Sequence, residues 1–120
     1  DMKKIKIIDS LDLIRDDIKA SFEENYINVV NSHENKMLFI GAINQYFKSL
    51  QSQGVLYDGA DCKAYIDVES QREWLAQKYD VSGMTDSEIE VANTGSIIFA
   101  GADITIQDCI EDLSFKIGLE

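Results

Sequence analysis

The sequence is poor in the residues from which most catalytic and metal centres are built. It contains one histidine, His33, two cysteines, Cys62 and Cys109, and no proline. A lone histidine near a polar helix start is usually a solvated residue rather than a base or a ligand, and no second histidine is present to activate a nucleophile. The cysteines are too far apart in sequence for a C-x-x-C redox pair or a zinc pair. We therefore expect free thiols, with a disulfide as the alternative.

Phosphate-binding and metal-binding motifs are also absent. No G-x-x-x-x-G-K, G-x-G-x-x-G or H-E-x-x-H occurs. Asp58 and Glu69 have the spacing of the end ligands of a calcium loop. The residues between them do not fit, because Ala60, Cys62 and Lys63 stand where oxygen ligands and a glycine are needed. The sequence therefore predicts no enzyme, no metal site and no cofactor.

Positive charge is scarce. The chain has 11 basic and 22 acidic residues, a net charge of −11, and no basic run. Nucleic-acid binders present clusters of lysine and arginine, so that class is excluded. The acids are scattered, which favours solubility as their role, with a basic partner surface as the alternative. No apolar run reaches the length of a membrane span and no signal peptide is visible, so we expect no membrane insertion.

The last third of the chain predicts a β-hairpin. From Leu113 to Leu119 apolar and polar residues alternate, as they do in a half-buried strand. The preceding run, 97–106, is apolar on both faces, and residues 107–109 are too few for a crossover. A hairpin alone is marginal in water. Helices must therefore cover it, and its free edge needs a partner or protection.

Two other segments are candidate strands. Isoleucine and lysine alternate over Lys3–Ile8, which indicates a short edge strand. Asp9 or Ser10 would then cap the first helix. Cys62–Asp67 is the second candidate, after a turn at residues 58–61.

Apolar residues at helical spacing predict the first two helices. The first helix carries a single apolar stripe, formed by Leu11, Ile14, Ile18 and Phe22. The longest helix is expected from about His33 to Gln53, with Asn31 or Ser32 as its cap and Gly54 as its stop.

Two shorter helices follow. Asp67 and Ser70 mark the start of a helix that extends to about Tyr79. This helix is expected to bury Leu75, Tyr79 and Trp74. Thr85 and Glu88 form a capping box that opens a short acidic helix.

These segments predict one α+β domain over residues 1–120. The expected architecture is a small, mainly antiparallel sheet, made of the N-terminal strand and the C-terminal hairpin, covered by about four helices. The length and the balance of 45% hydrophobic and 28% charged residues suit a single domain with its own core.

The order of these segments resembles the C-terminal domain of contractile tail sheath proteins. The resemblance extends from about Lys3 to Leu119 and is most specific in two segments, Asn35–Leu56 and Asn93–Ile117. The first segment, written with the preceding Glu34, reads E-N-K-M-L-F-I-G-A-I-N-Q-Y-F-K-S-L-Q-S-Q-G-V-L. The second reads N-T-G-S-I-I-F-A-G-A-D-I-T-I-Q-D-C-I-E-D-L-S-F-K-I. It is nearest to the sheaths of phages, defective prophages and R-type bacteriocins of Gram-positive bacteria.

The resemblance implies a structural and mechanical function. Sheath subunits polymerise as a sleeve around the tail tube, are assembled in the host cytoplasm, and contract to drive the tube through an envelope. The implied partners are other sheath subunits and the tube protein, and the implied location is a virion or phage-tail-like particle. A sheath subunit is much longer than this chain, so the resemblance implies an excised domain whose sheet is completed by strands from neighbouring subunits.

Two sets of residues are predicted to make these contacts. Inter-subunit strand pairing is expected at both ends of the chain, through Lys4, Ile5, Lys6, Ile7, Leu113, Ser114, Phe115, Lys116 and Ile117. Asp86, Glu88 and Glu90 are candidates for facing the tube, with a solvated helix face as the alternative.

Two other functions stay in competition at this point. A small acidic enzyme or ligand-binding domain would need a concave site with converging polar groups, and its only candidate residues are His33, Asp58, Asp61 and Asp67. Another tail component, such as a tube or baseplate subunit, is the third interpretation, and a lower helix content would distinguish a tube protein.

Overall fold

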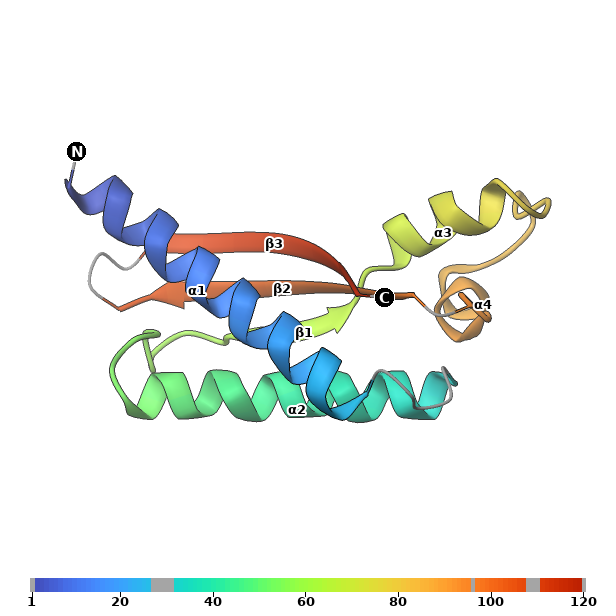
Figure 1. Ribbon diagram of the computed structural model, residues 1–120. Coiled ribbons are helices and arrows are strands. Elements are labelled where there is room, and N and C mark those ends of the chain that lie inside the picture. The colour runs from blue at the N-terminus through green and yellow to red at the C-terminus, as the bar shows by residue number, and fades with distance from the viewer. Residues whose placement is uncertain (1, 27–31, 96, 108–110, 120) are drawn as a thin grey trace.

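The computed structural model describes residues 2–26, 32–95, 97–107 and 111–119. Within them the chain forms an α+β fold with a three-stranded antiparallel sheet of order β1-β2-β3, which confirms the predicted fold class (Figure 1). The elements in chain order are α1 (Met2–Asn25), α2 (His33–Ser52), β1 (Lys63–Ile66), α3 (Val68–Ala76), α4 (Asp86–Val91), β2 (Ile98–Ile106) and β3 (Glu111–Leu119).

The predicted C-terminal hairpin is confirmed. β2 and β3 pair antiparallel from Ile98 opposite Leu119 to Ile106 opposite Glu111. β1 pairs with the other side of β2, so the candidate strand at Cys62–Asp67 belongs to the sheet. Cys62, just before β1, has a free thiol, whereas Cys109 lies outside the described residues.

The predicted N-terminal strand is wrong. Residues 3–8 are helical and belong to the first turns of α1, so neither Asp9 nor Ser10 is a cap. The Ile–Lys alternation is only a few residues long, and Ile7 also stands four residues before Leu11, in step with the apolar stripe of the helix. No glycine or proline interrupts this stretch, and the longer periodicity prevails.

α1 and α2 cover one face of the sheet. Figure 1 shows α1 crossing the strands obliquely and α2 lying alongside β1. Ser32 caps α2 by accepting the Asn35 amide hydrogen, and Gly54, with φ of 79°, follows its last turn. Asn31, the alternative cap, lies outside the described residues. One hydrophobic core results, which includes Ile14, Ile18, Phe22, Phe39, Ile40, Ile43, Phe47, Leu56, Ile66, Ala100, Ile104 and Phe115.

α3 and α4 form a second, smaller cluster at one end of the sheet (Figure 1). Its buried members are Leu75, Val81 and Ile89. Both predicted caps are present, because Asp67 accepts the Ser70 amide and the Thr85–Glu88 capping box is closed in both directions. The prediction for Tyr79 is wrong, since its side chain is 66% exposed and α3 ends at Ala76.

Candidate functional site

The outer edge of β1 is closed by α2. The Asp67 amide donates to the Phe99 carbonyl of β2. Because successive residues of a strand point their backbone groups to opposite sides, the backbone N–H and C=O of Ala64, an odd number of residues earlier, point away from β2. The Ala64 amide donates instead to Oδ1 of Asn44 in α2, over 2.7 Å. A buried edge amide therefore has a partner from a helix, and this edge is not available for strand addition.

The outer edge of β3 has a different environment. Because Phe99 and Thr105 of β2 accept hydrogen bonds from the β1 side, the residues that alternate with them, Ala100, Ala102 and Ile104, point their backbone groups to β3. Their partners on β3 include Phe115 and Ile117. The alternate residues must face outward, and these are Asp112, Ser114, Lys116 and Gly118. Among the described residues no further strand pairs with this edge.

One side chain reaches this edge from α1. Nη2 of Arg15 donates to the outward-facing carbonyl of Lys116 over 3.4 Å, and the guanidinium lies 5.4 Å from the ring centroid of Phe115. Nε of Arg15 is buried and finds no partner within the described part of the chain. Arg15 also lines a groove of about 530 Å³ between α1 and the edge of β3.

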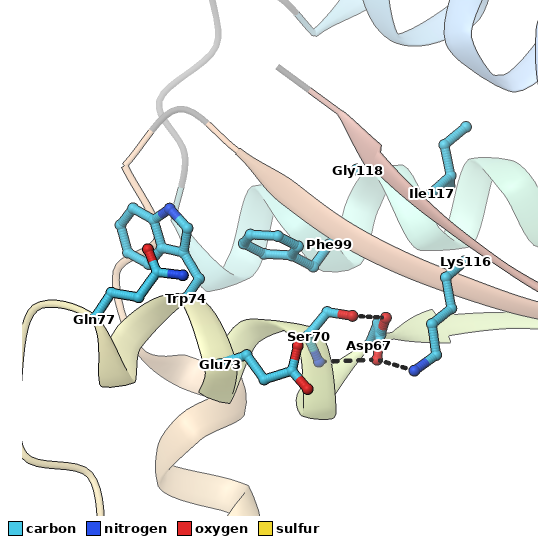
Figure 2. A pocket seen from close by; sticks show the side chains of 9 residues that line it. All are labelled: Asp67, Ser70, Glu73, Trp74, Gln77, Phe99, Lys116, Ile117 and Gly118. Carbon is cyan, nitrogen blue, oxygen red and sulfur yellow. Dashed lines mark hydrogen bonds and ion pairs between the residues drawn. The ribbon is translucent and has the colours of Figure 1, made fainter.

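A second hollow borders the same part of β3 on its other face. This cleft, of about 380 Å³, lies between α3 and the sheet. Figure 2 shows the side chains that line it. Its lining residues are Asp67, Ser70, Glu73, Trp74, Gln77, Phe99, Lys116, Ile117 and Gly118. The last three also line the groove beside α1. The edge of β3 at residues 116–118 is therefore hollowed on both of its faces, which leaves room for a strand and its alternating side chains.

Charges in the cleft beside α3 are arranged around Lys116. Nζ of Lys116 lies 3.2 Å from the Glu69 carboxylate and 3.7 Å from that of Asp67. The hydrogen bond that Lys116 donates to Glu69, and next the charge of Asp67, raise the pKa of Lys116 above its usual value. Asp67 is buried, and its carboxylate also caps α3 by accepting the Ser70 amide hydrogen (Figure 2). Burial and the cap together hold this carboxylate in place.

The two glycines of the sheet differ in how much space surrounds them. Gly101 is covered by Tyr65, whose ring would lie 2.5 Å from a Cβ added there. Gly118 stands opposite Phe99, and a Cβ added at this position would meet nothing within 4 Å. The missing side chain at Gly118 therefore helps to open the cleft.

Comparison with protein-family models matches the description "Phage tail sheath C-terminal domain" over residues 1–118. The chain belongs to this family. It is also 37% identical over 117 residues to the tail sheath protein of Clostridium phage phiCD119, an alignment that covers 96% of this chain and 32% of that relative. The sheath domain described here thus spans about a third of the length of the curated relative that it matches.

The predicted pairing residues of this sheath domain are found in two different settings. Leu113–Ile117 lie in β3 at the edge of the sheet, and Ser114 and Lys116 are among the residues whose backbone faces outward. Lys4–Ile7 lie in α1 and form no strand.

The predicted tube-facing acids of the sheath domain all lie on α4. Asp86 forms an ion pair with Arg72 over 2.8 Å, and Glu88 takes part in the capping box. Glu90 is partly buried, and its carbonyl accepts a hydrogen bond from Gln71.

The residues named for an enzymatic site do not converge. His33 begins α2, and Asp58 and Asp61 follow its far end. A helix of 20 residues is about 30 Å long, so the histidine is distant from both acids. Asp67 serves as a helix cap, and the described residues contain no group of three or more His, Cys, Asp or Glu that could hold a metal. No helix in the described ranges is long and apolar enough to cross a membrane.

Residues for which the sequence predicted no role in strand pairing also shape the edge. Arg15, Glu73, Trp74 and Gly118 come from three elements and meet only after folding. The sequence pattern places Gly118, which has no side chain, on the polar face of the predicted strand. Nothing in the sequence places α3 beside it.

Proposed function

We propose that this chain is the part of a contractile sheath subunit through which neighbouring subunits are joined by strand addition at β3. The observation that carries the proposal is the outward-facing backbone of Ser114, Lys116 and Gly118, at an edge with which no further strand of the described chain pairs. Arg15 of α1 contacts this edge at the Lys116 carbonyl, so an added strand would replace that one side-chain bond. The opposite edge of the sheet is closed by Asn44, so the sheet offers one receptive side.

The sheath built in this way would surround a tail tube and contract to drive it through an envelope. The support for this role is family membership together with the tail sheath protein that the chain resembles. The proposed partners are other sheath subunits and the tube protein, and the proposed location is a phage virion or phage-tail-like particle assembled in the host cytoplasm. In this role the 120 residues act as one domain of a longer subunit and catalyse no reaction. The family match favours a sheath over a tube or baseplate subunit.

Strand pairing at β3 suits a polymer because each joint is weak. A backbone hydrogen bond contributes about 0.5–1.5 kcal/mol net, so a few bonds at one edge hold a single strand loosely. Many joints acting together hold a sleeve firmly, because each later contact forms between subunits that are already neighbours. Pairing through Lys4–Ile7 would require these residues to leave α1, so β3 is the edge at which we expect strand addition. The acidic face of α4 stays a prediction for the tube contact.

Ser114→Pro in the full-length subunit tests this proposal. Proline at this position removes an outward-facing N–H and leaves the ladder to β2 intact, which is where edge strands tolerate it. Ser114→Ala is the matched control, because both variants lose the hydroxyl bond to Asp103. We expect sleeves by negative-stain microscopy from the alanine variant and none from the proline variant. Normal sleeves from a folded proline variant would refute strand addition at this edge.

A further inference from the structure

The cleft beside α3 is placed to receive a side chain from an added strand. In paired strands, residues that stand opposite each other point their side chains to the same face of the sheet. A residue that pairs with Gly118 would therefore point to the face on which α3 lies, the face shown in Figure 2. Gly118 itself contributes no side chain to this space.

The base of the cleft is aromatic. The rings of Trp74 and Phe99 have centroids 6.3 Å apart, and both side chains are partly exposed. Figure 2 shows them on the side of the cleft opposite Lys116. Such a base favours a long side chain, because an aliphatic stem or a guanidinium plane packs well on aromatic rings.

The rim of the cleft has more negative than positive charge. Asp67 and Glu69 are already engaged with Lys116. The Glu73 carboxylate lines the cleft and contributes to the raised pKa of Lys116 through its charge, but among the residues that the structure describes it forms no hydrogen bond or ion pair. Nζ of Lys78 lies 5.0 Å from the Trp74 ring, but Lys78 does not line the cleft. Three acids thus surround one lysine, and this excess of negative charge favours a second cation.

We propose that this cleft receives one arginine or lysine side chain from the strand that a neighbouring sheath subunit adds to β3. Its stem lies across Gly118 on Phe99 and Trp74, and its charge meets Glu73. The inference depends on the proposed strand addition and adds a rule for the partner: the residue opposite Gly118 is cationic. Arginine fits better than lysine, because its planar guanidinium both stacks on the indole and forms two bonds with a carboxylate.

Synthetic strands provide the test. The probes are three labelled, capped peptides, T-V-T-V-X-V-T-V-T, with arginine, glutamine or glutamate as X, titrated against the full-length subunit by fluorescence anisotropy. All valines occupy one face, so only X changes on the other face. An exposed ion pair and an aromatic contact together predict that the arginine peptide binds about 3- to 10-fold more tightly than the glutamine peptide. The glutamate peptide should bind most weakly.

Three variants of the subunit make the result specific. Glu73→Gln should reduce the advantage of arginine to about twofold or less, the residual expected of the aromatic contact alone. Glu23→Gln, at an exposed glutamate of α1 that does not line the cleft, should leave the advantage unchanged. Gly118→Val fills the cleft without meeting a neighbouring atom at Cβ, and should weaken the arginine peptide more than the glutamine peptide. Unfolding curves confirm that each variant is folded.

The failures of the two proposals are distinguishable. If the three peptides bind equally and Ser114→Pro abolishes their binding, strand addition holds and the cationic rule is overturned. If the arginine advantage in Glu73→Gln is as large as in the wild-type subunit, the cleft is not the site of recognition and the inference is also overturned. If no peptide binds to the folded wild-type subunit, strand addition at β3 itself fails, and the rule fails with it.

Discussion

The hydrogen bond that closes the β1 edge can be removed without changing the hydrophobic core. In Asn44→Ala, the Ala64 amide loses the acceptor that it has among the described residues. Ala64 is 7% exposed, so water cannot easily replace the lost oxygen. A buried donor left without a partner costs about 1–3 kcal/mol. For a domain of this size each kcal/mol lowers the melting temperature by roughly 4 °C, so we expect a decrease of about 4–12 °C.

Asn44→Asp is the matched control, because it keeps an oxygen at the same position. We expect this variant to retain the Ala64 amide bond and to lose less stability than the alanine variant. Thermal unfolding followed by circular dichroism gives the size of the effect, and hydrogen exchange at the Ala64 amide gives its location. An unchanged melting temperature in Asn44→Ala, with that amide still protected, would show that the edge is not closed by this bond.

Two further predictions concern buried groups inside the domain. Lys36 is 1% exposed and donates to the Ala92 carbonyl, and burial lowers its pKa from 10.5. At pH values between the lowered pKa and 10.5, the unfolded chain therefore binds more protons than the folded chain. The free energy of unfolding of the wild-type domain, relative to that of Lys36→Met, should then rise with pH in this window, as measured by urea unfolding. Loss of this slope would contradict the burial argument. Gly101→Ala should destabilise the domain by about 1–3 kcal/mol because Tyr65 occupies the space, whereas Gly118→Ala should stabilise it by roughly 0.5 kcal/mol. Equal urea midpoints for the two alanine variants would contradict the difference in space.

Local chemistry was predictable where a short pattern determines the structure. The Asp67 and Thr85 caps, the Gly54 stop and the alternation of β3 each depend on residues within a few positions of one another. Lys3–Ile8 shows the limit of this reasoning, because a few alternating residues suit a strand and a helix alike. The stripe that begins at Leu11 decided between them.

The candidate site was predictable only in part. The sequence identified Ser114 and Lys116 as edge residues because an alternating strand at the end of a hairpin must have a free side. It did not identify Arg15, which meets Lys116 across 101 positions of sequence. Nor did it show that α3 would place Trp74 and Glu73 beside Gly118, since no local pattern encodes the position of a helix relative to a distant strand.

The closure of β1 by Asn44 limits what the described residues can build alone. If two such sheets paired through their β3 edges, a twofold axis would relate the two copies. Both β3 edges would then be occupied, and assembly would stop at a dimer. An open-ended filament would therefore need a strand from another part of the subunit, so that each copy accepts a strand from one neighbour and donates a strand to another.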